Sequence, residues 1–372
     1  MSAPDREYLL DGVSINGLPK VSLHDHLDGG LRPQTIVELA DEIGLQLPRS
    51  DASELGRWFA EQSNAGSLVQ YLKTFDVTVG VMQTRDGLAR VAREFVEDLH
   101  ADGVVYGEVR WAPEQHLQRG LSLDEAVDAV QSGIDQAVRA VEATGGYIRV
   151  GQLVSSLRHN PGRTREIAEL AVRHRDSGVV GFDVAGPEAG FPASTMRTAF
   201  DYLAGEWFPV TVHAGEAAGL DSIASALLDG RALRLGHGVR IAEDLLVERQ
   251  DDENTYVSLG LLAQWVKDRE IALETSPSSN LQTGAIAQWG ESLVEHPFDL
   301  LYQLGFRVTV NVDNRLMSDT SLSRELSLLT EAFAYRLDDL ETFQLNAAAA
   351  AFLPIEEREE LVDRIALGFD AV

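Results

Sequence analysis

Short apolar segments rich in β-branched residues recur along the chain, and amphipathic stretches separate them. Each segment predicts a β-strand, and there are eight: 19–27, 104–113, 147–157, 179–186, 209–216, 234–239, 271–280 and 307–314. Stretches such as 123–143 and 164–175 carry apolar residues at helical spacing. This alternation of strand and helix is typical of an α/β protein with a parallel (β/α)8 TIM barrel. An open doubly wound sheet is the competing fold, but no GxGxxG motif follows any predicted strand.

The interval between the first two predicted strands, residues 28–103, is too long for one crossover helix and predicts extra helices after strand 1. It contains an apolar stripe at helical spacing, formed by Leu68, Tyr71, Leu72 and Phe75. Such a stripe most often packs in a core. After the first strand of a barrel, however, it could cover the mouth of the active site as a lid.

The C-terminal part of the chain completes the predicted domain. Residues 315–372 have helical character and predict a helical C-terminal tail. The sequence shows no internal repeat, low-complexity segment or convincing linker. We therefore expect one barrel domain over residues 1–372, with a helical lid insertion at about 45–100.

The composition is that of a soluble globular protein, with 44% apolar and 24% charged residues. No apolar run approaches the roughly 20 residues of a membrane span, and the N-terminus lacks the features of a signal peptide. A cytoplasmic location is the resulting expectation. Cysteine is absent, so disulfides are excluded and any metal site must use His, Asp or Glu ligands.

The formal net charge is −28, from 31 basic and 59 acidic residues. A surface of this sign repels nucleic acids and anionic membranes, whose binding requires cationic side chains. We therefore expect a small, neutral or cationic partner, and neither nucleic acid nor membrane. No pattern in the sequence specifies an oligomeric state.

Candidate catalytic residues gather at the ends of the predicted strands, where barrel enzymes hold their active sites. Four of the nine histidines lie there: His24, His26, His213 and His237. His24 and His26 alternate with Asp25 along the first strand, so both imidazoles face the same way. Taken alone, a His-x-His pair is also compatible with two core or surface histidines.

Two further strand ends can complete the ligand set of a metal. His213 can supply a third nitrogen and Asp313 an oxygen, which together with His24 and His26 suit catalytic zinc. Each has a simpler explanation, a hydrogen-bonded core histidine for His213 and a helix or turn cap for Asp313. Convergence of all four in one barrel mouth favours the metal.

Lysine usage indicates one metal ion rather than two. The chain has three lysines, Lys20, Lys73 and Lys267, and none lies at the end of a predicted strand. A two-metal hydrolase site bridged by a modified lysine is therefore excluded, and one zinc per chain is expected.

Two more residues at strand ends can take part in a reaction. Zinc lowers the pKa of a bound water to about 7, which makes hydroxide available at neutral pH. Glu216, three residues after His213, can give a proton to the substrate as hydroxide attacks. His237 can steady that hydroxide. The alternatives are a helix cap or surface acid for Glu216, and a backbone hydrogen bond for His237.

The chain resembles the adenosine deaminase family in motifs that follow one another in order. They are HDHLDGG, VVYGEVRWAP, FDVAGPE, VTVHAGE, RLGHG, LETSPSSNLQTG and VTVNVDN. The resemblance extends from about Leu18 to the low 320s and includes every predicted strand. It implies a (β/α)8 barrel with one zinc that converts adenosine to inosine and 2′-deoxyadenosine to 2′-deoxyinosine, with release of ammonia, in purine salvage.

The resemblance also assigns roles to single residues. The zinc ligands would be His24, His26, His213 and Asp313. Glu216 would protonate purine N1 while the hydroxide attacks C6, and His237 and Asp313 would orient that hydroxide. Asp28 would bind a ribose hydroxyl, with His26 close to the sugar.

The residues expected at the base include one departure from the family. The backbone of Gly186 would meet purine N3. The family usually has two acids in tandem on strand eight, whereas this chain has Asp313-Asn314. The second acid bonds purine N7, which only accepts, and an Asn amide can donate that hydrogen bond without being protonated.

Two other functions stay open at this point. Asn314 leaves room for the same chemistry on free adenine or a modified adenine nucleoside. A barrel that only binds purine nucleosides is the non-enzymatic alternative, but binding alone needs no acid at Glu216. AMP and polynucleotides are disfavoured, because Asp28 and the net charge of −28 repel phosphate.

Overall fold

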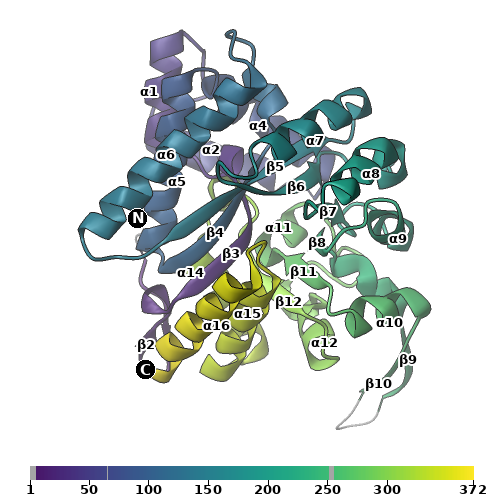
Figure 1. Ribbon diagram of the computed structural model, residues 1–372. Coiled ribbons are helices and arrows are strands. Elements are labelled where there is room, and N and C mark those ends of the chain that lie inside the picture. Colours follow the sequence, from purple (N-terminus) through teal and green to yellow (C-terminus); the bar gives the residue numbers. More distant parts are fainter. Residues whose placement is uncertain (1–5, 65, 251–254) are drawn as a thin grey trace.

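The computed structural model describes residues 6–64, 66–250 and 255–372. At its centre, parallel strands form two four-stranded sheets (Figure 1). The first contains β3 (Lys20–His26), β4 (Val104–Trp111), β5 (Arg149–Leu157) and β6 (Val179–Ala185). The second contains β7 (Thr211–Ala214), β8 (Arg234–His237), β11 (Ala272–Thr275) and β12 (Val308–Val310). Each of these strands lies within one of the predicted segments.

The two sheets close into a barrel through two parallel bridges. Phe182 of β6 bridges Val210, which lies just before β7. On the other side, Asp25 of β3 bridges Asp313, which follows β12. The predicted (β/α)8 TIM barrel is therefore confirmed, with the first and last strands of the barrel side by side.

The seam between β3 and β12 is reinforced by side-chain hydrogen bonds. Asn311 Oδ1 accepts from the backbone N–H groups of Leu23 and His24, at 3.0 Å each. The backbone N–H of His26 donates to the Asp313 carbonyl at 2.8 Å. These contacts fix the backbone that carries His24 and His26 relative to the backbone that carries Asp313.

Amphipathic helices cover the outside of the barrel (Figure 1). They include α6 (Leu123–Ala143), α7 (Thr164–Arg173), α8 (Arg197–Gly205), α9 (Leu220–Leu228), α10 (Leu261–Asp268) and α12 (Phe298–Gln303). The longest, α6, begins with a capping box formed by Ser122 and Glu125. Its inner face buries Val127, Val130 and Ile134. No helix among the described residues combines the length and the apolar character needed to cross a membrane.

The extra helices after the first barrel strand and the helical tail are both present, as predicted. The first set comprises α1 (Pro33–Ile43), α2 (Ala52–Ser63), α3 (Leu68–Tyr71), α4 (Phe75–Val81) and α5 (Arg85–Ala101). The tail comprises α13 (Arg315–Ser318), α14 (Leu322–Phe333), α15 (Leu337–Ala350) and α16 (Ile355–Asp370). Helix α15 packs against β12 and β3, and so supports the seam of the barrel.

Two parts of the chain differ from the prediction. The segment 271–280 is a strand only as far as Thr275, because Pro277 starts the short helix α11 (Pro277–Gln282). An antiparallel hairpin of β9 (Leu245–Gln250) and β10 (Thr255–Leu259) was not predicted. It projects from the barrel (Figure 1), and its Leu246 and Val247 are exposed. It therefore lacks the half-buried alternation on which strand prediction depends.

A shorter ribbon, β1 (Leu9–Leu10) with β2 (Val13–Ser14), precedes the barrel.

Candidate active site

A cavity of about 280 Å³ lies at the carboxyl ends of the barrel strands. Its lining includes most of the candidate residues: His26, Asp28, Gly186, His213, Glu216, His237, Asp313 and Asn314. His24 is fully buried, with its ring 4.6 Å from the ring of His213. The structure thus brings together every residue to which the sequence assigned a role.

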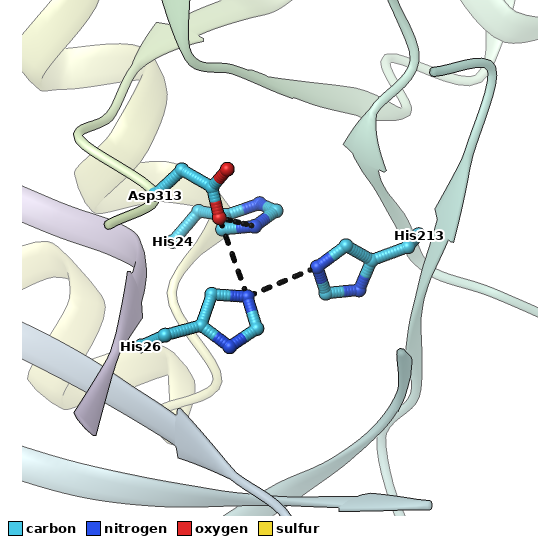
Figure 2. A group of neighbouring side chains, drawn as sticks. All are labelled: His24, His26, His213 and Asp313. Carbon is cyan, nitrogen blue, oxygen red and sulfur yellow. Dashed lines mark hydrogen bonds and ion pairs between the residues drawn. The ribbon is translucent and has the colours of Figure 1, made fainter. Parts of the chain in front are cut away.

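Three imidazoles and a carboxylate point toward one another beside this cavity (Figure 2). We call His24, His26, His213 and Asp313 the metal group. The Nε2 atoms of His26 and His213 are 3.1 Å apart. Asp313 Oδ1 lies 3.3 Å from Nε2 of both His24 and His26. The candidate ligand atoms all lie within 4.8 Å of one another, which is the spacing of a single coordination sphere.

Oxygen atoms on the far side of two rings determine which nitrogen carries the proton. His213 Nδ1 lies 3.0 Å from Asp183 Oδ1 and 3.0 Å from the Val184 carbonyl, and both oxygens accept. His24 Nδ1 likewise faces Glu274 Oε2 at 3.2 Å. Both rings therefore turn the lone pair of Nε2 toward the carboxylate of Asp313. A divalent cation relieves this repulsion, and a donor set of three nitrogens and one oxygen fits zinc.

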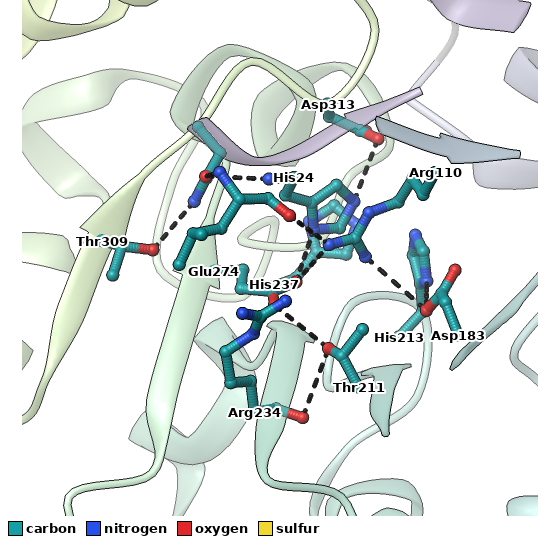
Figure 3. Close-up of polar contacts among 12 residues, drawn as sticks. His24, Arg110, Asp183, Thr211, His213, Arg234, His237, Glu274, Thr309 and Asp313 are labelled. Atoms are coloured by element: carbon teal, nitrogen blue, oxygen red, sulfur yellow. Dashed lines mark hydrogen bonds and ion pairs between the residues drawn. The ribbon is translucent and has the colours of Figure 1, made fainter. Parts of the chain in front are cut away.

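A buried charge network lies behind the metal group (Figure 3). Arg110 of β4 donates to Glu274 Oε2 at 2.7 Å and lies 3.6 Å from Asp183 Oδ1. Arg234 of β8 donates to the other oxygen of Glu274 at 2.6 Å. Burial alone would raise the pKa of Asp183, but the His213 imidazole and the Arg110 guanidinium outweigh it and hold that pKa below its ordinary value. The ionised acids keep the imidazoles in one orientation.

His237 and Asp313 share an uncommon backbone conformation. Their φ angles are 63° and 57°, in the left-handed region that is unfavourable for residues other than glycine. Each lies where the chain leaves a strand, β8 for His237 and β12 for Asp313. Asp313 is also held by Ser279, whose Oγ donates to Asp313 Oδ2 at 2.5 Å. Such strain is concentrated at functional sites, and here it directs both side chains to the cavity.

Glu216 lies in the loop after β7, and Glu188 holds this loop in place. Glu188 Oε1 accepts from the backbone N–H of Gly215 at 2.7 Å, and Oε2 accepts from the N–H groups of residues 216–218 at 2.6–3.0 Å. Burial raises the pKa of Glu216 to about 8, helped by the negative charges of Asp313 and Glu188. At neutral pH the Glu216 carboxyl therefore carries a proton that it can donate.

His237 faces Glu216 across the cavity wall. Its Nε2 lies 3.6 Å from Glu216 Oε2, and its Nδ1 lies 3.0 Å from Asn280 Nδ2. Burial lowers the pKa of His237 to about 4, so the ring is neutral at pH 7. Among the described residues, the His237 ring makes no hydrogen bond to the backbone, which was the alternative role for it.

The residues expected to bind the substrate form another part of the wall. Burial raises the pKa of Asp28 to about 7. Asn314 is buried, and its Oδ1 has no hydrogen-bond partner among the described residues. Gly29 makes room for it, because a Cβ at position 29 would lie 2.0 Å from Asn314 Oδ1. Gly186 has a φ of 94°, which only glycine adopts readily.

The apolar stripe formed by α3, the 3₁₀ turn Leu72–Thr74 and α4 also lines the cavity. Its members are Leu68, Tyr71, Leu72 and Phe75. The other side of the same helix faces solvent, with Val69 62% exposed. The stripe therefore forms an apolar wall of the cavity, and its action as a lid stays a prediction.

The lysines lie away from the metal group. Lys20 starts β3 at the opposite end of the barrel, where its buried ammonium donates to the carbonyls of Ile15 and Leu18 at 2.6 and 2.8 Å. Neither Lys73 nor Lys267 lines the cavity. The binding of one metal ion per chain stays a prediction.

The sequence reasoning missed the residues that hold the metal group and the acid. Asp183 and Glu188 lie in the motif FDVAGPE, and Glu274 lies in LETSPSSNLQTG. Asp183 and Glu274 are carboxylates inside strands that are otherwise buried. A charged residue in a buried strand requires a partner, and that signal could have identified both.

The model of the adenosine deaminase family matches residues 19–367. Adenosine deaminase 1 of Streptomyces coelicolor is 55% identical to this chain over 352 residues, which cover 94% of this chain and 87% of that protein. The chain belongs to the adenosine deaminase family. It is therefore a hydrolase, and the resemblance inferred from the motifs is confirmed. Adenosine deaminase of Mycobacterium ulcerans, another member, is 52% identical over 95% of each chain.

Two solved structures have the same fold as this family member. The N6-mAMP deaminase MAPDA of Arabidopsis superposes with a TM-score of 0.78 at 27% identity and covers 96% of this chain and 99% of its own. An amidohydrolase from Burkholderia ambifaria, solved with bound Zn, has a TM-score of 0.81 at 22% identity, covering 100% of this chain and 98% of its own. At that identity the second likeness concerns the fold alone.

Proposed function

We propose that this member of the adenosine deaminase family catalyses the zinc-dependent hydrolytic deamination of adenosine and 2′-deoxyadenosine, giving inosine and 2′-deoxyinosine with release of ammonia. The observation that carries the proposal is the position of Glu216, whose pKa is raised by burial, beside the metal group in one cavity. Relatives named adenosine deaminase at 52–55% identity support the choice of substrate.

One zinc would be held by His24, His26, His213 and Asp313. When bound there, it supplies a Lewis acid that makes water nucleophilic at neutral pH. The ionised Asp183 and Glu274 hold two of the imidazoles from behind, so the ligand nitrogens stay aimed at one point.

Glu216 is the general acid of the proposed reaction. Its carboxyl donates a proton to purine N1, which makes C6 more electrophilic as the C6–O bond to water forms. One proton of that water returns to the Glu216 carboxylate, and the other leaves with the amino group as ammonia when the C6–N bond breaks. Asp313 and His237 hydrogen-bond to the attacking oxygen and set its direction. The strained backbone at both residues indicates that their orientation is selected for this role.

The rest of the lining supports a nucleoside as substrate. We propose that Asp28 binds a ribose hydroxyl beside His26, that the Gly186 backbone meets purine N3 and that Asn314 donates to N7. No lysine or arginine is among the described residues that line the cavity, so a 5′-phosphate would meet no fixed positive charge. The proposed substrate is therefore a free nucleoside, unlike the mononucleotide named for the Arabidopsis relative.

The alternative substrate is adenine or a modified adenine nucleoside, and Asn314 in place of the second acid motivates it. The test is one preparation of metal-replete protein, assayed by ultraviolet absorbance on adenosine, 2′-deoxyadenosine, adenine, N6-methyladenosine and AMP. We expect the highest kcat/KM on adenosine and 2′-deoxyadenosine. No change in absorbance with either nucleoside would refute the proposal, and a higher kcat/KM on adenine or N6-methyladenosine would favour the alternative.

Two expectations from the sequence stay predictions beside this function. The cytoplasmic location can be tested by fractionating the source cells. The description as one domain with a lid at about 45–100 can be tested by limited proteolysis, with and without a bound nucleoside analogue.

A further inference from the structure

A row of four buried groups leads from the start of helix α12 to the cavity. It runs from the backbone N–H of Phe298 through His296 and Asn280 to His237. His296, Asn280 and His237 are 3%, 0% and 1% exposed, so water does not compete for their hydrogen bonds. Neither His296 nor Asn280 lines the cavity, so neither can touch a substrate there.

The first member of the row can only donate. Phe298 is the first residue of α12, and the N–H groups of a first helical turn have no partner within the helix. Its N–H donates to His296 Nδ1 at 3.0 Å. His296 Nδ1 must therefore carry a lone pair. The ring is fully buried, which lowers its pKa to about 3, so it is neutral and its proton is on Nε2.

The direction of every later hydrogen bond follows from this one. His296 Nε2–H lies 3.2 Å from Asn280, so the Asn280 atom that faces it must be the accepting oxygen Oδ1. The other atom of the amide is then the donor Nδ2, which lies 3.0 Å from His237 Nδ1. His237 Nδ1 accepts, and the proton of that ring is on Nε2, the nitrogen nearer to Glu216.

We propose that Asn280 and His296 are positioning residues, which hold His237 as the tautomer that presents its Nε2–H to the reacting groups. His237 then donates a hydrogen bond to the attacking oxygen and cannot serve as the base that removes its proton. The inference rests on the proposed function, because it specifies how His237 acts in that reaction.

The row also opposes the wrong form of His237. A proton on His237 Nδ1 would require Asn280 to turn its oxygen toward that ring. The amide nitrogen would then face His296, whose Nε2 would have to accept and whose Nδ1–H would meet the Phe298 N–H head-on. If Asn280 does not turn, its amide N–H meets the His237 Nδ1–H; if the whole row turns, the His296 Nδ1–H meets the Phe298 N–H. Both arrangements leave two buried donors in contact, which is unfavourable.

The test measures the tautomer of His237 directly. Zinc-loaded protein labelled with ¹⁵N-histidine is studied by long-range ¹H–¹⁵N correlation, with His237 assigned through a His237→Asn variant. We expect the Nε2–H pattern in the unsubstituted protein at neutral pH. In Asn280→Asp a carboxylate accepts from both rings, so His237 should change to the Nδ1–H form or the cation. We expect kcat to fall about 10²-fold there, with KM changed only a few-fold.

Two substitutions at His296 separate positioning from folding. In His296→Gln the amide nitrogen takes the place of Nε2 and can still donate to Asn280, so the tautomer and most of kcat should be retained. In His296→Leu this donor is lost, and we expect kcat to fall about tenfold or more. The matched control is His116→Leu, which removes another fully buried histidine outside the row and should leave the His237 pattern and kcat unchanged.

The outcomes are distinguishable. An Nδ1–H or doubly protonated His237 in the unsubstituted protein would overturn the inference, and so would an unchanged pattern and kcat in both Asn280→Asp and His296→Leu. If the Asn280 variant fails to fold, the unsubstituted protein and His296→Leu still decide. An Nε2–H pattern in a protein that deaminates no purine would refute the proposed function alone.

Discussion

Glu188 accepts a hydrogen bond from the backbone N–H of Glu216 at 3.0 Å, so one buried acid holds the loop that carries another. The contact has two physical effects. It fixes the position of the Glu216 backbone, and it brings a negative charge that contributes to the raised pKa of the Glu216 carboxyl. Position and protonation of the proposed general acid therefore depend on the same neighbour.

Replacing Glu188 by Gln should reduce turnover while the metal stays bound. An amide can accept at only one end, so at least one of the loop hydrogen bonds is lost and Glu216 shifts. We expect kcat to fall by up to about 10²-fold, since misplacement by an ångström can cost that much. Glu94→Gln is the control, because Glu94 is buried on α5 with Thr35 and Arg90 as partners. Equal losses in both variants would contradict the prediction.

The pH dependence of the reaction should report the protonation of Glu216. A general acid works only while protonated, and the pKa of Glu216 is about 8. We expect kcat/KM to fall as the pH rises through about 8. Because the charge of Glu188 is one cause of the raised pKa, the fall should begin at lower pH in Glu188→Gln. If kcat/KM falls over the same alkaline pH range in both proteins, Glu188 has no electrostatic effect on Glu216.

Glu216→Gln should separate binding of the metal from catalysis. Glutamine keeps the size of the side chain but has no acidic proton for purine N1. We expect full zinc content and a loss of kcat of about 10²- to 10⁴-fold. Metal analysis and the absorbance assay on the same preparation provide the measurement. Turnover at the original rate would show that the proton comes from another group.

Metal removal should abolish activity and lower the thermal midpoint together. A cation that binds the native state alone stabilises it by mass action. Dialysis against a chelator is expected to abolish the activity and to lower the thermal midpoint, and added zinc is expected to restore both to their original values. His24→Ala should lower zinc content and activity in parallel, because His24 belongs to the metal group. Full metal occupancy in this variant would transfer the ligand role to another residue.

Gly29→Ala tests the close approach of the first and last strands of the barrel at the substrate wall. The new Cβ would lie 2.0 Å from Asn314 Oδ1, so Asn314 must move. We expect KM to rise about tenfold, because the proposed hydrogen bond from Asn314 to the base is lost and one hydrogen bond accounts for a change of that size. Gly17→Ala is the control, since a Cβ there meets nothing within 4 Å. A KM unaffected by Gly29→Ala would remove Asn314 from the binding site.

Buried neutral histidines should make the fold sensitive to acid. Burial lowers the pKa of His116 from 6.5 to about 4, so the unfolded chain takes up this proton first as the pH falls. This contribution to stability is present above pH 6.5 and is lost as the pH falls toward 4. Between pH 7 and 5 the loss amounts to about 2 kcal/mol. Denaturant titrations should show a smaller pH dependence of the free energy of unfolding in His116→Leu, by about that amount. Equal dependences would mean that His116 is protonated in the folded protein.

Local patterns were sufficient to predict the barrel and the metal group. His24 and His26 are two residues apart on a strand, so their common direction follows from strand geometry, and the barrel brings the other strand ends to the same face. The partners of these residues were not predictable in the same way. Asn280 acts through His237, and His296 acts through both Asn280 and His237. Their proximity depends on where α11 ends and α12 begins. No spacing in the sequence encodes that arrangement.

The metal group has a mechanical consequence, because it takes two ligands from each half of the barrel. His24 and His26 lie on β3 of the first sheet, whereas His213 lies on β7 of the second sheet and Asp313 follows β12 of that sheet. An ion bound by all four would add a cross-link between the halves, beside the junction of β3 with the chain after β12. That junction is also held by the Asp25–Asp313 bridge, by hydrogen bonds of His26 and Asn311, and by the packing of α15 on both strands. We therefore expect the metal-free chain to open more readily at this junction than the zinc-loaded chain does, and to be cut faster there by proteases.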